Sequence, residues 1–190
     1  MVKFGVFSTA LVVLTVALAG CGETSNTESG GAQSSAKSGA AAAGWNAADA
    51  CSILDKAAVG AALGQDVKET QLGLVHEAGA ADAATSECSY IGADGSTLVT
   101  AMTRWSPIND NSQASFDGTR NAAASALKAF SDKQVEDIPA LGKAAFIVPG
   151  IDALTVFIDD ARMVTVTVQK VPDGGSGKDI AIALAKKAGA

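Results

Sequence analysis

Residues 22–44 limit where this chain can fold, because they include no large apolar side chain. Glycine, alanine, serine and threonine make up most of the segment. Such a composition buries too little surface to offset the entropy lost on ordering the backbone, about 1–2 kcal/mol per residue. We therefore expect a flexible linker with a root-mean-square reach of about 25–30 Å. A single folded domain is expected in residues 45–190.

An apolar leader precedes the linker. Lys3 is the only charged residue among the first 20, and the uncharged run after it ends in the small residues Ala19 and Gly20. This is the layout of an export signal. The run is shorter than the roughly 20 residues that a helix needs to cross a bilayer core. The leader alone leaves three interpretations open: a lipoprotein signal, an ordinary secretory signal and an uncleaved transmembrane anchor, and the residues at its end favour the first.

The four residues Leu18-Ala19-Gly20-Cys21 resemble the lipobox of bacterial lipoproteins. The resemblance implies that residues 1–20 are a lipoprotein signal peptide and that a lipidated Cys21 begins the mature chain. Each buried lipid methylene contributes about 0.8 kcal/mol, so two or more acyl chains (palmitate, for example) anchor a protein stably. Gly22 stands where an Asp would mark inner-membrane retention in a Gram-negative host. We therefore expect an envelope protein on the outward face of the cell membrane, or of the outer membrane if the host is Gram-negative.

The chain is acidic, with 14 Lys and Arg against 20 Asp and Glu and a formal net charge of −6. Binding to phosphates requires clustered Lys and Arg side chains, and the sequence contains no basic stripe. The composition therefore argues against nucleic acid as a partner. Besides the membrane, the expected partner is an envelope protein or a small ligand that the sequence does not identify.

Three cysteines occur, and Cys21 is assigned to lipid. Cys51 and Cys88 remain, and an even pair in an exported protein predicts a disulfide. A redox site would favour Cys-x-x-Cys spacing. A zinc site would require further Cys or His ligands, and His76 is the only histidine. The structural disulfide is therefore the favoured interpretation.

Hydrophobic periodicity and turn residues predict alternating groups of helices and strands. Helices are expected in 48–63, from a cap at 109–111 to about Phe130, and in 178–188. The first of these is expected to break near Leu54 and restart at an Asp55 cap, with Gly64 as its stop. Strands are expected at 72–76, 88–91, 97–105, 154–158 and 162–170, with two more inside 134–148. Closely spaced late strands predict an α+β fold, a mostly antiparallel sheet with helices packed on one face.

No group of residues predicts catalysis. A catalytic triad would require His76 and a Gly-x-Ser-x-Gly elbow, which is missing from the sequence. The glycine-rich segment 174–178 departs from a phosphate loop, because Pro172 replaces the first glycine and Asp179 replaces the hydroxyl residue. Residues 109–111 lack the Gly and Glu that complete a calcium loop. We therefore predict no catalytic residue, no cofactor and no metal site.

The expected function is a tethered, non-enzymatic binding or accessory module. Two alternatives stay open. One is a cell-envelope hydrolase that uses carboxylates alone, with Glu77, Asp82 and Glu87 as candidates. The other is a carrier of an apolar ligand, because a layer of helices on a sheet can open a pocket between its layers.

Several short segments, taken together, resemble a group of bacterial lipoproteins known best from actinobacteria. They are 49–54 with Cys51, the Ala-rich stretch 57–64, Cys88-Ser89-Tyr90, and 138–145. Members of this group carry an Ala-rich helix with a Cys and, later, a Cys followed two positions on by an aromatic residue. The likeness covers most of residues 48–188. It implies an outline similar to the PsbP-like α/β sandwich and transfers no catalytic residue.

Overall fold

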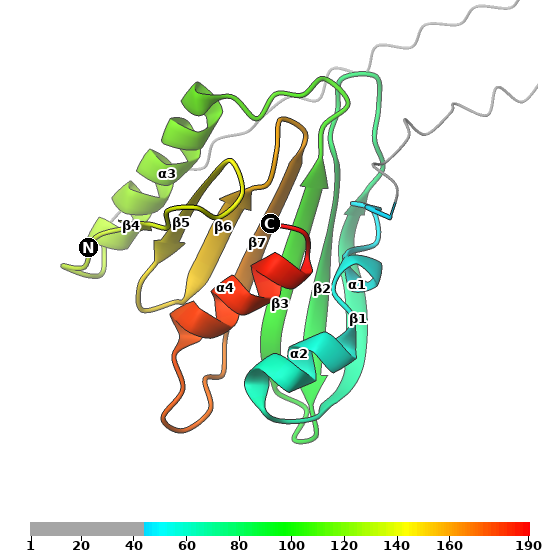
Figure 1. Cartoon of the computed structure of the whole chain (residues 1–190), viewed down its shortest axis with the longest axis vertical. Coiled ribbons are helices and arrows are strands. Elements are labelled where there is room, and N and C mark those ends of the chain that lie inside the picture. The colour runs from blue at the N-terminus through cyan, green and yellow to red at the C-terminus, as the bar shows by residue number, and fades with distance from the viewer. Residues whose placement is uncertain (1–43) are drawn as a thin grey trace, which may run out of the picture. The chain divides into compact units, whose positions relative to one another are not determined.

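A seven-stranded antiparallel sheet forms the centre of the domain in a computed structural model, which describes residues 44–190 (Figure 1). The strand order is β1-β2-β3-β7-β6-β5-β4, and each neighbouring pair is antiparallel. The expected α+β class with an antiparallel sheet is therefore confirmed. Cys21, the leader and the linker up to residue 43 lie outside the described residues. The strands are β1 (Val67–His76), β2 (Ala84–Gly92), β3 (Thr97–Trp105), β4 (Glu136–Asp137), β5 (Ala144–Val148), β6 (Ala153–Phe157) and β7 (Arg162–Val168).

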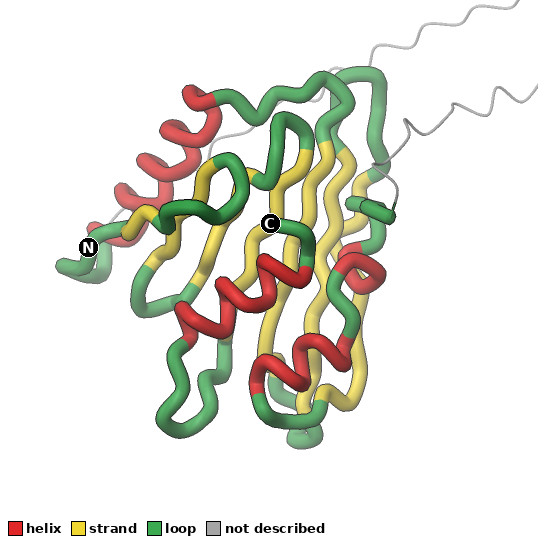
Figure 2. The backbone as a smooth tube through the Cα atoms, viewed as in Figure 1, coloured by secondary structure: helices red, strands yellow, loops and turns green. Residues whose placement is uncertain are grey.

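Three of the four described helices cover one face of the sheet (Figure 2). They are α1 (Ala50–Ile53), α2 (Lys56–Leu63) and α4 (Gly177–Lys187). Figure 1 shows them in front of the sheet, whereas α3 (Gln113–Lys128) lies apart from them on the side of β5 and β6.

Local signals set the ends of the first helices as the sequence predicts. The Asp55 carboxylate accepts a hydrogen bond from the Ala58 backbone N–H at 2.8 Å, which begins α2. Gly64 ends the same helix with φ +64°, a left-handed conformation that glycine adopts without steric cost. Leu54 is extended and separates α2 from α1.

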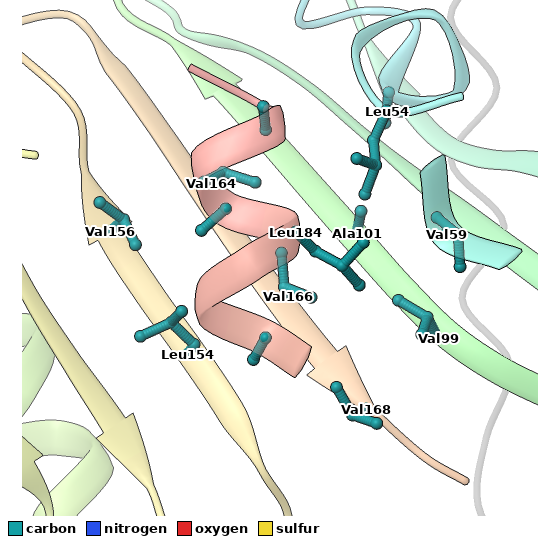
Figure 3. Packing of buried hydrophobic residues seen from close by; sticks show 14 of the residues in the cluster. Leu54, Val59, Val99, Ala101, Leu154, Val156, Val164, Val166, Val168 and Leu184 are labelled. Carbon is teal, nitrogen blue, oxygen red and sulfur yellow. The ribbon is translucent and has the colours of Figure 1, made fainter. Parts of the chain in front are cut away.

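The main core lies between the sheet and the three covering helices (Figure 3). Burial alternates along strand β7, with Val164, Val166 and Val168 buried and the threonines between them half-buried. Figure 3 shows Leu184 of α4 close to Val166 and to Ala101 of β3. Leu184 is fully buried, and burying a leucine side chain contributes about 1.5–3 kcal/mol. Apolar contact between α4 and the middle strands therefore holds this layer in place.

The prediction that the helices pack on one face needs a correction for α3. Its residue Phe116 makes edge-to-face ring contacts with Phe146 of β5 and Phe157 of β6, at centroid distances of 5.7 and 5.5 Å. Phe146 faces away from its neighbours Ala145 and Ile147, which belong to the main core. Strands β5 and β6 are therefore apolar on both faces, and each face requires a covering layer.

The start of α3 also differs from the prediction that one of residues 109–111 would cap it. The cap is Ser112, whose hydroxyl accepts from the Ser115 backbone N–H at 3.1 Å. The Asn111 side chain instead donates to the carbonyls of Asp159 and Arg162 at 2.9 and 3.0 Å. Asn111 thus ties the start of α3 to the turn between β6 and β7.

Tyr90, the only tyrosine in the chain, is fully buried on β2. Its hydroxyl donates a hydrogen bond to the Leu54 carbonyl, which joins the sheet to the end of α1. Burial raises the pKa of Tyr90, and the nearby carboxylates of Asp55 and Asp49 raise it further. The neutral phenol is therefore part of the folded structure.

This arrangement predicts a pH-dependent loss of stability. The folded state holds the phenol proton more tightly than the unfolded chain, whose tyrosine pKa is about 10. The stabilisation is therefore complete well below pH 10 and falls as the pH rises further, by about 1 kcal/mol at pH 11. Urea unfolding at pH 8 and 11 measures the loss, and Tyr90→Phe should lack this part of it. Absorbance of the folded protein at 295 nm gives a direct check. A tyrosinate signal near pH 10 without unfolding contradicts the prediction.

Candidate functional site

The disulfide expected between Cys51 and Cys88 is present, with a Cα–Cα distance of 5.1 Å. It joins α1 to the middle of β2, and Cys88 is fully buried. The loop that it closes contains α2 and the whole of β1. The disulfide therefore fixes the first helices and the outer strand pair to one another.

The residues considered for a hydrolase do not line the hollows described below. Glu77 and Asp82 are exposed between β1 and β2. Glu87 is half-buried in the middle of β2, on the face away from α1 and α2, and His76 is exposed at the end of β1. Within residues 44–190, no group of three or more His, Cys, Asp or Glu side chains is placed to hold a metal ion.

A dense polar cluster surrounds the turn between β6 and β7. One guanidinium nitrogen of Arg104, Nη2, donates to both carboxylate oxygens of Asp110, at 2.7 and 2.9 Å, and lowers the pKa of that carboxyl. Burial alone would raise the pKa of Asp159, but the backbone N–H groups of Arg162 and Ala161 and the Arg162 side chain lower it. These charged groups bind one another and hold the turn and the loop before α3 together. We interpret the cluster as structural.

Two surface hollows of similar size carry charged side chains, and a third, of about 250 Å³, is lined by Asp137 and Lys143, which pair with Arg120 and Asp160. The first, of about 360 Å³, lies between α3 and the loop before β4, and Arg120, Lys128 and Lys133 contribute to its lining. Arg120 is already bound to Asp137 at 2.5 Å. The second, of about 390 Å³, lies beside the ion pair of Lys170 with Asp94. Arg120 and the Lys170–Asp94 pair are thus engaged with the protein itself, whereas Lys128 and Lys133 of the first hollow form no ion pair with a described residue.

Strand β1 differs from the rest of the sheet because it is both long and open. Only Val67 of its ten residues is buried. Three exposed residues of β1 are large and apolar: Leu72 is 46 % exposed, Leu74 72 % and Val75 51 %. The sequence predicts a strand only at 72–76, because residues 67–71 are mostly polar. Pairing with β2 extends the strand to Val67.

The opposite edge of the sheet is protected. Strand β4 has only two residues, both acidic. Glu136 pairs with Lys178 at 2.6 Å, and Asp137 pairs with Arg120. Short, charged edge strands prevent pairing with other chains. Among residues 44–190, no comparable protection covers the middle of β1, so β1 is the accessible edge of the described sheet.

The backbone of β1 is irregular at both ends. Its register with β2 shifts between Val67 and Glu69, and again between Gly73 and His76. Leu74 lies in the second irregularity with φ +51°, a conformation that costs a non-glycine residue energy. Backbone strain of this kind is concentrated at functional sites. The exposed edge of β1 is therefore the candidate functional site.

Comparison with known proteins identifies no relative of this chain. No family model matches the chain, and neither a curated protein nor a solved structure matches it. The resemblance to actinobacterial lipoproteins therefore stays a prediction.

Proposed function

We propose that this protein is a lipid-anchored envelope lipoprotein whose folded domain is a non-catalytic binding or accessory module. The observation that carries the anchor is Leu18-Ala19-Gly20-Cys21 at the end of an uncharged leader. Lipid on Cys21 would hold the chain at the outward face of a bacterial membrane, and residues 22–44 would link it to the domain.

One feature of the domain supports this proposal. The Cys51–Cys88 disulfide suits an oxidising compartment outside the cytoplasm. Within the described part of the chain, no helix is long and apolar enough to span a bilayer.

Binding is favoured over catalysis by where the polar groups lie. The densest charged cluster, around Arg104 and Asp159, consists of groups that bind one another. The exposed edge of β1, by contrast, has apolar side chains and backbone groups that no other strand of residues 44–190 pairs with. For an apolar-ligand carrier, the space between sheet and helices holds the side chains of the main core. No specific observation therefore favours the hydrolase or the apolar-ligand carrier.

Metabolic labelling with an alkyne analogue of palmitate tests the anchor. We expect the native chain to take up the label and to sediment with membranes. Cys21→Ser should lose both properties completely, because no other cysteine stands at the cleavage site. Thr24→Ser, three residues away, serves as the control and should be labelled normally. A labelled Cys21→Ser chain, or an unlabelled native chain, refutes the lipid anchor.

A further inference from the structure

We propose that β1 is the docking edge for an extended, basic segment of a partner protein, which joins the sheet as an eighth strand. This inference rests on the proposed binding function and names the class of partner. The pairing would place the segment beside β1, the terminal strand of the order β1-β2-β3-β7-β6-β5-β4.

The first support is the hydrogen-bonding capacity of the edge. An edge strand presents unpaired N–H and C=O groups, which an added strand satisfies. Between its two irregularities, β1 keeps a regular register with β2 from Glu69, opposite Ile91, to Gly73, opposite Glu87. These five residues can pair regularly with a segment of similar length.

The second support is an apolar surface that begins at Leu72 within this regular stretch and continues through Leu74 and Val75 in the irregularity after it. Leu72, Leu74 and Val75 are three of the six large apolar residues that are exposed in the described part of the chain. In strand addition, the backbone bonds supply affinity, and side-chain contacts select the partner. The exposed leucines and valine would therefore select a segment with apolar residues facing them.

The third support is charge. Residues 67–87 contain four carboxylates but only one lysine, and none of these five forms an ion pair with a described residue. The carboxylates are Glu69, Glu77, Asp82 and Glu87. Complementary charge accelerates encounter and selects partners. Strand β1 itself contributes one lysine and one glutamate, and the excess of negative charge comes from Glu77 and Asp82 in the loop after β1 and from Glu87 of β2. A second copy of this chain would bring the same carboxylates and a net charge of −6. The edge therefore fits a basic partner better than self-association.

A synthetic probe tests this inference. The probe is the fluorescein-labelled heptapeptide Lys-Val-Thr-Val-Lys-Val-Lys, added to the native chain in detergent. We expect saturable binding by anisotropy and slower amide exchange confined to β1. The same peptide with Glu in place of Lys should bind at least about tenfold more weakly. The absence of binding, or protection elsewhere in the domain, overturns the proposal.

A matched pair of variants tests the location. Leu72→Lys should weaken binding of the basic peptide at least about tenfold, because it places a like charge on the edge and removes an apolar contact. Ile151→Lys adds the same charge at a residue of nearly equal exposure, 48 % against 46 %, and should bind normally. Far-ultraviolet circular dichroism confirms that both variants fold.

Equal binding of the basic peptide by the two variants overturns the proposal that β1 is the docking edge. Crosslinking of native chains to each other through β1 also overturns it, because the occupant would then be a second copy. The palmitate-labelling experiment tests the lipid anchor independently of peptide binding. A labelled chain that does not bind the peptide refutes this inference and leaves the lipid anchor in place.

Discussion

Removal of the Cys51–Cys88 disulfide lowers the free energy of unfolding by about 4 kcal/mol. The two residues are 37 positions apart, and a crosslink over such a loop restricts the unfolded chain strongly in the loop-entropy model. The bond also joins α1 to β2, whose residue Tyr90 binds the end of that helix. Folding of the first helices onto the sheet therefore depends on it.

Urea unfolding of the mature chain with Cys21→Ser, compared with the same chain carrying Cys51→Ala and Cys88→Ala, measures this cost. Cys21→Ser removes the remaining thiol and the lipid from both samples. Reduction with dithiothreitol should destabilise the disulfide-containing chain by a similar amount and leave the alanine variant unchanged. A difference below about 1 kcal/mol would show that the crosslink contributes little, contrary to the loop-entropy argument.

Phe116→Ala should cost about 3–5 kcal/mol of stability, the usual range for a buried Phe. Phe116 is 8 % exposed and contacts both Phe146 and Phe157, so its removal leaves a cavity between α3 and the sheet. The expected result follows from the position of α3 on the face opposite the other helices.

Phe130→Ala provides the control for this prediction. Phe130 follows the same helix but is 66 % exposed, so the substitution should change stability by less than about 0.5 kcal/mol. Thermal and urea unfolding of both variants give the comparison. Equal effects at the two positions would contradict the packing of α3 described above.

Features set by local sequence are predicted well. Asp55 and Gly64 mark the ends of α2 because capping and left-handed geometry depend on only a few neighbouring residues. The alternation of valine and threonine in β7 indicates its buried face before any neighbour is known. The turns that join β2 to β3 and β6 to β7 are predicted by their Gly and Asp residues for the same reason.

Features set by distant contacts are not predicted. The position of α3 depends on β5 and β6 lying side by side with both faces apolar, which follows from strand order. Asn111 looks like a cap in sequence, but its partners, the carbonyls of Asp159 and Arg162, are about 50 residues away.

The candidate site escapes sequence analysis for a related reason. Leu72, Leu74 and Val75 have the composition of a buried strand. Only the strand order shows that β1 has no described strand on one side and that these side chains are exposed in the described domain. Exposure, and therefore the docking edge, follows from the topology of the whole sheet.

Intact-mass and N-terminal fragment analysis of the chain purified from its own membranes tests the central claim most directly. The account predicts a mature chain that begins at Cys21 and carries at least two acyl chains on that residue. A chain that retains Met1, that begins at another residue, or that begins at Cys21 without lipid would contradict it.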